Sequence, residues 1–161
     1  MILGNQVEWA LHCCVILASQ PKESYVATKY LAEFHGVPKE YLSKALQALS
    51  NAGIIEGTLG PRGGYRLAKP ANRISFLSVV EAVEGTSSTF VCKEIRENNP
   101  CLKKKDRPSA VCAIAKAMYK ADEAWRKELR SVSISAVSEE LTAKLPADLL
   151  KATEAWFSER V

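Results

Sequence analysis

Three of the five cysteines in this chain fall in or beside one polar segment in the second half of the sequence. Cys92, Cys101 and Cys112 follow one another with the spacing C-x8-C-x10-C. Thiolates are soft ligands that suit iron–sulfur clusters or zinc, but the sequence has no C-x2-C pair of the tight zinc-ribbon type. From the residues alone this is a cysteine-bearing loop, and metal binding and thiol chemistry both stay open.

Three thiolates are one ligand short of four, so a complete metal site needs a donor from elsewhere in the chain. The sequence has two histidines, His12 and His35, and a candidate acid, Glu8, near His12. Glu8 and His35 also have ordinary interpretations, as an acid in the first turn of a helix and as an exposed residue at a turn. We expect His12, Cys13 and Cys14 to be surface or packing residues, since Cys14 falls on an apolar stripe.

Periodicity and turn residues predict the elements that position these side chains. Apolar residues at helical spacing predict helices over residues 5–19, about 27–35, and from Pro38 to about Asn51, with Gly36 ending the second. The segments "IIEGT" and "GYRLA", on either side of a glycine-rich tip, predict a β-hairpin. Helix, helix-turn-helix and hairpin in this order predict a winged helix-turn-helix.

The remainder of the chain predicts a mainly α fold with a small β-hairpin. "ISFLSVVEAVEG" is expected to be a short amphipathic helix, followed by a polar loop. A long helix is expected over about 110–130, with an apolar seam wide enough to pack against another helix, and a last helix over about 147–158. We divide the chain into a winged helix-turn-helix domain over residues 1–84, a sensor loop over 85–109, and a unit of long helix and C-terminal helix over 110–161.

The third helix and the hairpin tip carry residues that suit DNA. Lys39, Tyr41, Ser43 and Lys44 lie near the start of the helix, where they can reach phosphates or base edges in the major groove. Arg62 sits among glycines at the tip, where a thin loop can enter a narrow minor groove. The apolar residues expected to face inward are Tyr41, Leu42, Ala45, Leu46 and Leu49. The alternative is a winged-helix module that binds protein.

The bulk composition fits these expectations and disfavours an enzyme. The chain has 161 residues, 47% hydrophobic and 25% charged, with a net charge of +4, which is compatible with nucleic-acid binding. Neither a signal peptide nor an apolar run of about 18 residues is evident, so we expect a cytoplasmic protein without a membrane span. We find no Ser/His/Asp arrangement, phosphate loop or pair of carboxylates that would indicate a catalytic site.

Longer stretches of the sequence resemble a known family. "YLSKALQALSNAGIIEGTLGPRGGYRLAKP" followed by "ISFLSVVEAVEG" is similar to the Rrf-two family of bacterial transcription regulators. "VEWALHCC", "FVCKEIRE" and "CAIAKAM" resemble its redox-sensing RsrR type, a relative of IscR and NsrR. The resemblance implies a homodimer built on the long dimerisation helix, a palindromic double-stranded DNA operator, usually repression, and often an iron–sulfur cluster. The sequence departs at the wing, where Leu59 stands in place of an operator-contacting Arg of some members.

The resemblance also implies a set of cluster ligands. In RsrR-like members a Glu of the first helix and a His near the end of the second, supplied by the partner subunit, complete the cluster, and Glu8 and His35 match those places. Two of the three loop cysteines would complete the set; we favour Cys101 and Cys112, with Cys92 open. Mixed oxygen, nitrogen and sulfur ligands favour a [2Fe–2S] cluster. The alternative, seen in other branches, is a regulator without a cluster that senses through thiols or a ligand.

Overall fold

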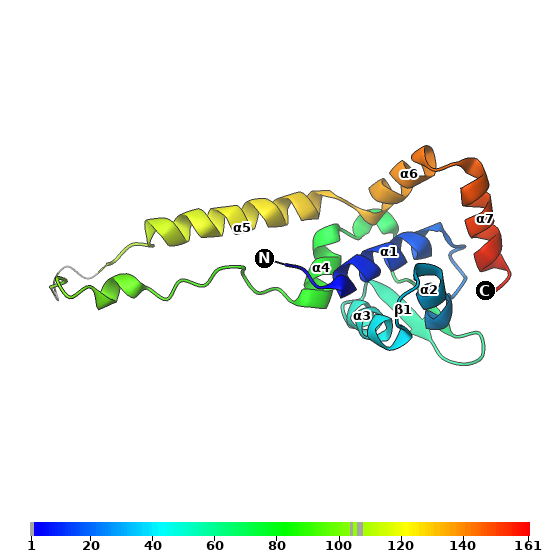
Figure 1. Ribbon diagram of the computed structural model, residues 1–161, viewed down its shortest axis with the longest axis horizontal. Helices are drawn as coiled ribbons and strands as arrows, with labels where there is room; N and C mark the ends of the chain where they lie inside the picture. Colours follow the sequence, from blue (N-terminus) through cyan, green and yellow to red (C-terminus); the bar gives the residue numbers. More distant parts are fainter. Residues whose placement is uncertain (1, 104, 106–107) are drawn as a thin grey trace.

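The computed structural model describes residues 2–103, 105 and 108–161. Two parts of the chain differ in shape (Figure 1). We call residues 2–85 and 132–161 the head, and residues 86–131 the arm. The head gathers most of the helices and the hairpin, while the arm is an outgoing loop that returns as one long helix (Figure 1).

Helix α1 (Asn5–Ser19) forms the centre of the head. Its buried residues recur at helical spacing and are Val7, Ala10, Cys13, Cys14 and Leu17. The helix contacts α3, α4 and α6 on different sides. The predicted helix over residues 5–19 is confirmed.

Helices α2 (Thr28–His35) and α3 (Lys39–Asn51) form the expected helix-turn-helix. Gly36 ends α2 in the left-handed conformation, at φ 62°, and its N–H donates to the carbonyls of Ala32 and Glu33. Glycine adopts this conformation without the steric cost that a Cβ adds. The next residues, Val37 and Pro38, then lead into α3, so the first residue of α3 follows His35 closely in the chain.

The inward face of α3 corrects one expectation. Its buried residues are Leu42, Ala45, Leu46 and Leu49. Tyr41 was expected to face inward, but 55% of its surface is exposed. Tyr41 lies one residue, or about 100° around the helix, before Leu42, and therefore points away from the buried face.

The wing is a hairpin of β1 (Ile55–Thr58) and β2 (Gly64–Leu67), paired antiparallel with Ile55 opposite Leu67. Val26 and Tyr65 exchange two backbone hydrogen bonds of 2.9 Å, which fasten the chain before α2 to the hairpin. At Gly64 a Cβ would lie 2.4 Å from the backbone of Val26, so this approach requires glycine. The hairpin is thereby held against the helix-turn-helix.

The C-terminal residues return to the head and include a helix that was not predicted. After α4 (Phe76–Glu84) and the arm, the chain forms α6 (Ile134–Lys144) and α7 (Ala147–Ser158); a 3-10 turn, η1 (Ala71–Arg73), precedes α4. The backbone N–H of Phe76 donates to the Val132 carbonyl at 2.9 Å, and that of Ile134 donates to the Ile74 carbonyl at 2.9 Å. Ile134 is the one buried residue of α6, and the other apolar side chains of this helix stay partly or largely exposed.

Helix α7 packs on α2 through aromatic side chains. Phe157 is fully buried, and its ring centroid lies 4.9 Å from that of Phe34. Trp156 lies 5.4 Å from Phe34, and the guanidinium of Arg160 lies 4.0 Å from the centre of the Trp156 ring. The end of the chain therefore covers the helix that carries His35.

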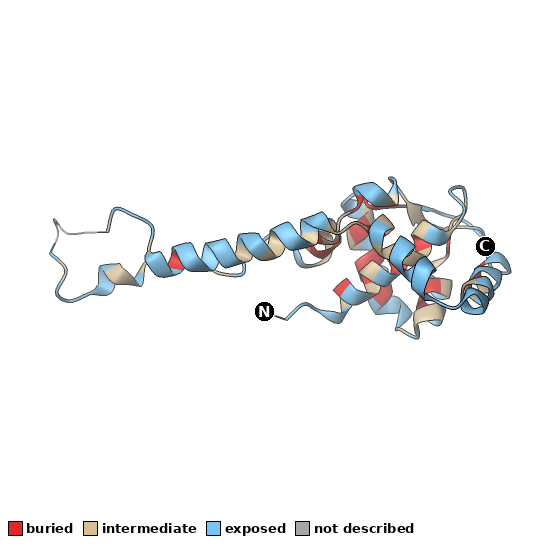
Figure 2. Cartoon of the chain, turned by 90° about the horizontal axis from the view of Figure 1, so that it is seen from above, coloured by how far each residue is buried: buried red, intermediate tan, exposed pale blue. Residues whose placement is uncertain are grey.

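The arm contains the 3-10 turn η2 (Ile95–Asn98) and the long helix α5 (Ala113–Ser131). The helix begins three residues later than the approximate start at 110, because Cys112 adopts an extended conformation as its N-cap. Among the arm residues that the structure describes, Ala115 is the one buried residue, and Figure 2 shows the buried positions gathered in the head. The arm therefore lacks a core of its own.

Candidate DNA-binding face and thiol sites

The start of α3 presents a polar surface. Lys39, Tyr41 and Lys44 are exposed, and the Lys44 ammonium lies 5.6 Å from the centre of the Tyr41 ring. The hydroxyl of Ser43 donates to the Lys39 carbonyl at 2.8 Å, so it is engaged within the helix. The lysines and the tyrosine are therefore free to contact DNA, while Ser43 would have to exchange a bond to do so.

The wing tip exposes one apolar and one basic side chain. Leu59 is 99% exposed and Arg62 is also exposed. Gly60 has φ +105°, and a Cβ at Gly63 would lie 2.5 Å from the Thr58 carbonyl oxygen, so both positions of the tip favour glycine. A hollow of about 410 Å³ separates the tip from the C-terminal half of α3, where Gln47 and Ser50 line it.

His35, the last residue of α2, is half-buried in the head. Its Nε2 is buried and has no hydrogen-bond partner among the residues that the structure describes. Its ring lies 5.6 Å from that of His12 and 5.1 Å from that of Phe34. Burial and, to a lesser degree, the neighbouring His12 lower the pKa of His35 below its usual 6.5, so the imidazole is held neutral at physiological pH.

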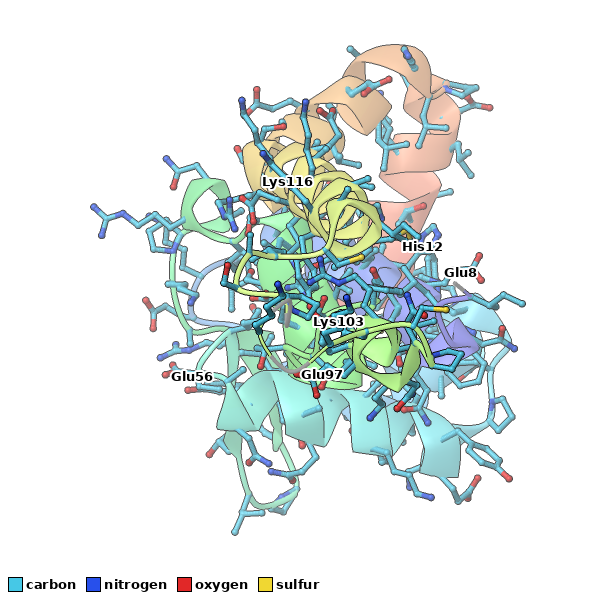
Figure 3. The ribbon with its side chains drawn as sticks, turned by 90° about the vertical axis from the view of Figure 1, so that its left-hand side faces the viewer. Glu8, His12, Glu56, Glu97, Lys103 and Lys116 are labelled. Atoms are coloured by element: carbon cyan, nitrogen blue, oxygen red, sulfur yellow. The ribbon has the colours of Figure 1, made fainter. Side chains whose placement is uncertain are left out.

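Glu8 and His12 lie one turn apart on α1, and Figure 3 shows the two side by side. Both are exposed, and both line a cavity of about 490 Å³ whose other walls are mainly apolar residues of α1, α4 and α6. Cys13 and Cys14 point elsewhere, since both are fully buried. Burial raises the pKa of the Cys13 thiol to about 12, and that of Cys14 is raised too, so they are inert packing residues, as expected.

The three arm cysteines have different surroundings. Cys92 and Cys112 are half-buried, whereas Cys101 is exposed, and all three are free thiols. The backbone N–H of Glu94 donates to Cys92 Sγ at 3.4 Å, and the Cys92 N–H lies 3.4 Å from the hydroxyl of Tyr119 on α5. The backbone N–H of Cys101 donates a hydrogen bond to the side-chain oxygen of Asn99 at 3.0 Å.

The five candidate ligands are not assembled within one chain. Among the described residues, no group of three or more His, Cys, Asp or Glu side chains is placed to hold a metal ion. Glu8 and His35 belong to the head, and the cysteine loop belongs to the arm that projects from it (Figure 1). Within the described part of one chain, the carboxylate and imidazole candidates thus lie apart from the thiol candidates.

The sequence did not indicate two arginines that organise the arm, one between the cysteines and one at its root. Arg96 forms an ion pair with Glu94 and donates to the Ala110 carbonyl at 2.7 Å, linking the two sides of the loop. At the root of the arm Arg126 pairs with Glu81 of α4 and with Asp122 of α5. Charged residues in a polar loop carry no periodic signal, so nothing in the sequence distinguished these arginines from solvated ones.

Comparison with known proteins identifies the family. A family model described as "Rrf2: Iron-dependent Transcriptional regulator" matches residues 3–140, most of the chain. The chain belongs to the Rrf2 (Rrf-two) family. It is 36% identical over 127 residues to the protein rrf2 of Nitratidesulfovibrio vulgaris, a match that covers 74% of this chain and 80% of that relative.

Solved structures share the fold of this Rrf2-family chain. CymR, the global cysteine regulator of B. subtilis, superposes with a TM-score of 0.68 at 18% identity, covering 87% of this chain and 98% of CymR. IscR of T. potens gives a TM-score of 0.65 at 20% identity, covering 91% of this chain and 93% of IscR. The winged helix-turn-helix expectation is confirmed.

Family membership fixes the broad function. The chain is a transcriptional regulator of the DNA-binding Rrf2 family and not an enzyme. Within the described residues, no helix is both long and apolar enough to cross a membrane. The polar faces of α3 and the wing are thus the candidate DNA-binding face of an Rrf2 regulator.

Proposed function

We propose that this Rrf2 regulator is a cytoplasmic homodimeric repressor that reads a palindromic operator and senses redox state through a [2Fe–2S] cluster. Glu8 and His35 of one subunit and two arm cysteines of the other would hold the cluster. The arrangement explains why one chain carries two half-sites that do not meet. In such a dimer, the second subunit would also bury the apolar side chains that are exposed on the arm.

The placement of His35 is the observation that carries this proposal. A buried polar atom without a hydrogen-bond partner is costly, and such atoms in folded proteins call for an explanation. The Nε2 of His35 is such an atom, and the lowered pKa of the ring leaves it neutral and able to act as a metal ligand. A metal ion supplied with thiolates from a second subunit would satisfy it.

The side chains proposed as ligands suit an iron–sulfur cluster. Thiolates suit iron–sulfur chemistry, and one imidazole together with one carboxylate would complete four ligands. When bound, the cluster would supply a one-electron couple whose potential an imidazole ligand raises.

The chain itself connects His35 to the DNA-binding face. Only Gly36, Val37 and Pro38 separate His35 from Lys39, the first residue of α3. A change in the orientation of His35 would therefore shift the start of the recognition helix. Operator affinity would then differ between two states of the protein, which is the coupling that allosteric control requires.

The local contacts favour Cys92 and Cys112 as the two thiol ligands. Cys92 Sγ already accepts a backbone N–H, a type of bond that tunes sulfur ligands, whereas Cys101 is exposed. Cys112 is half-buried and occupies the N-cap position of α5. The sequence alone favoured Cys101 with Cys112, and the surroundings of Cys92 are the reason to change that preference.

On the DNA side, we propose that α3 enters the major groove with Lys39, Tyr41, Ser43 and Lys44, and that the wing brings Arg62 to the minor groove. The exposure of Lys39, Tyr41, Lys44 and Arg62 supports this assignment. Two copies related by a two-fold axis would present two such faces, which suits a palindromic operator.

One preparation tests the cofactor. The protein is purified without oxygen, its visible spectrum is recorded, and iron and sulfide are measured. We expect a coloured protein with about two irons and about two sulfides per chain. His35→Ala should remove the difference in operator affinity between oxidised and reduced protein at fixed salt, and equal affinities of the two wild-type forms would refute redox control.

A second candidate is a repressor that senses through its thiols or a small ligand without a cluster. The three free thiols of the arm and the largely apolar cavity of about 490 Å³ beside Glu8 favour it. A protein that stays colourless after reconstitution with iron and sulfide would support this alternative. Glu8 and His35 would then be ordinary residues of their helices.

A further inference from the structure

The backbone beside Cys92 has an unusual conformation. Among the residues that the structure describes, Glu94 is the one non-glycine residue with positive φ, at 49°. This left-handed conformation is uncommon for residues with a side chain. Its result here is that the Glu94 N–H is directed at Cys92 Sγ, at 3.4 Å.

The side chain of Glu94 is held by Arg96. The guanidinium donates from Nε to Oε1 at 2.5 Å and from Nη2 to Oε2 at 2.7 Å. Two parallel bonds of this kind fix the orientation of both groups. The carboxylate therefore cannot turn away without breaking both bonds.

The same guanidinium also reaches the other side of the loop. Arg96 Nη2 donates to the carbonyl oxygen of Ala110 at 2.7 Å. Ala110 lies two residues before Cys112, which caps α5. The Arg96 side chain thus links the turn that contains Cys92 to the residues that lead into Cys112. The hydrogen bond at Cys101 goes to Asn99 instead of Arg96.

Stability of the fold does not account for this arrangement. Glu94 and Arg96 are each 36% exposed, and ion pairs of that exposure stabilise proteins little. The arm around them has no buried core for them to complete (Figure 2). Arg96 nevertheless links the residues beside both Cys92 and Cys112, through Glu94 and through Ala110.

We infer that Arg96, braced by Glu94, is a positioning residue that sets the spacing of Cys92 and Cys112 before any metal binds and offsets the negative charge of the Glu94 carboxylate. The inference rests on the proposed cluster but concerns the residues that prepare its thiol half-site. A fixed pair of thiols loses less freedom on binding a metal than a mobile pair. Because Arg96 offsets the negative charge of Glu94, its presence favours the more negative, reduced form of a bound cluster and so raises the reduction potential of that cluster.

Three variants separate the geometric role from the charge. Arg96→Gln removes both, Arg96→Lys keeps the charge but cannot make the paired bonds and the Ala110 link together, and Lys103→Gln removes one positive charge elsewhere on the arm. In the holoprotein we expect Arg96→Gln to weaken iron binding about 10-fold or more and to lower the reduction potential. Arg96→Lys should restore the potential but not the iron binding.

Two results in the holoprotein would overturn the inference. One is wild-type iron binding and potential in Arg96→Gln. The other is an equal loss of iron binding in Lys103→Gln, which would mean that any positive charge on the arm suffices. Circular dichroism and thermal melting of the head, unchanged in all three variants, exclude a general failure to fold.

A measurement on the apoprotein distinguishes failure of this inference from failure of the proposed function. Hydrogen exchange of the Glu94 amide, followed by NMR, reports the bond to Cys92 without any metal. We expect exchange several-fold faster in Arg96→Gln and unchanged in Lys103→Gln. If wild-type protein binds no iron but this difference is seen, the link exists and the cluster proposal fails; if wild-type protein binds iron and exchange is the same in all variants, the role of Arg96 fails.

Discussion

The head and the arm of this chain bury very different amounts of apolar surface. In the head, α1, α3 and α4 share a core of fully buried side chains that includes Leu42, Leu46 and Val79. In the described part of the arm, Ala115 alone is buried, and Ile114 is 70% exposed. The head thus has its own hydrophobic driving force for folding, whereas the described part of the arm has none and is attached to the head at its root.

The chemistry is divided along the same line. All five cysteines are free thiols, but those of the head are buried and inert, while those of the arm are at least partly accessible. Conversely, the head contains His35 Nε2, which is the one buried side-chain nitrogen or oxygen atom without a hydrogen-bond partner among the described residues. The unpartnered imidazole and the accessible thiols therefore lie in different parts of the chain, as the proposed sharing of ligands between two subunits requires.

The largest expected effect tests whether α7 belongs to the head. Phe157→Ala removes a fully buried ring from beneath Phe34 and should lower the free energy of unfolding by about 3–5 kcal/mol. Urea denaturation measures the change. Leu149→Ala is the matched control on α7, because that side chain is 48% exposed and its loss should have a small effect. Similar losses for the two variants would place α7 outside the core.

The next effect concerns the arm as a dimer surface. Ile114→Asp introduces a charge on the exposed apolar side of α5, where Met118 follows one turn later. We expect the dimer to dissociate at least tenfold more readily, about 1.4 kcal/mol or more, with unchanged melting of the head. Sedimentation velocity over a range of protein concentrations measures it.

The control for the dimer surface is Lys116→Asp. Position 116 lies two residues from Ile114 on the helix and therefore on a different side. It adds the same acidic side chain to α5 without removing an apolar one. Equal dissociation of the two variants would mean that α5 does not use its apolar seam to dimerise.

A smaller effect is expected at the root of the arm. Asp122 accepts hydrogen bonds from Thr89 and Arg126, at 2.7 Å and 3.0 Å, and these bonds lower the pKa of its carboxyl below the usual 3.8. A group with a lowered folded pKa stabilises the fold above its unfolded pKa, and this contribution is lost as the pH falls through the folded value. Asp122→Asn should therefore melt below wild type at neutral pH, with the gap closing below about pH 4.

Calorimetric melting over that pH range checks the prediction. Glu123→Gln serves as the control, because Glu123 is 65% exposed and its contact with Arg130 is 3.4 Å long. A gap between wild type and Asp122→Asn that stays constant into acid would show that the charge of Asp122 does not stabilise the root of the arm, where it joins Thr89 to Arg126.

The head was largely predictable from the sequence because its signals are local. Helical spacing predicted α1, and Gly36 and the glycines of the wing marked the turns that the structure contains. The exceptions are positions where packing decides. Tyr41 has an apolar ring but lies off the buried face, and α6 buries Ile134 alone, through backbone bonds to the strand-like segment around Ile74.

The arm and the site were less predictable, for a physical reason. The bond from Glu94 to Cys92 depends on a backbone angle that no residue type in "FVCKEIRE" demands, and Arg96 reaches Ala110 across the loop. Contacts of this kind depend on the loop conformation and not on a repeat in the sequence. Candidate ligands could be named from residue type, but not the residues that position them.

The smallest effect separates charges on the head from charges on the arm. The logarithm of affinity for duplex DNA of random sequence falls linearly with the logarithm of salt concentration, by about 0.9 for each phosphate neutralised. Arg62→Gln on the wing should reduce this slope by about that amount, and so should Lys39→Gln on α3, whereas Lys103→Gln on the arm should not. Leu59→Ala is the matched control on the wing, because it alters the 99% exposed neighbour at the tip without changing charge. Fluorescence anisotropy at several salt concentrations measures all four variants. An unchanged slope for Arg62→Gln would mean that the wing contacts no phosphate, and a reduced slope for Lys103→Gln would extend the DNA-binding surface onto the arm.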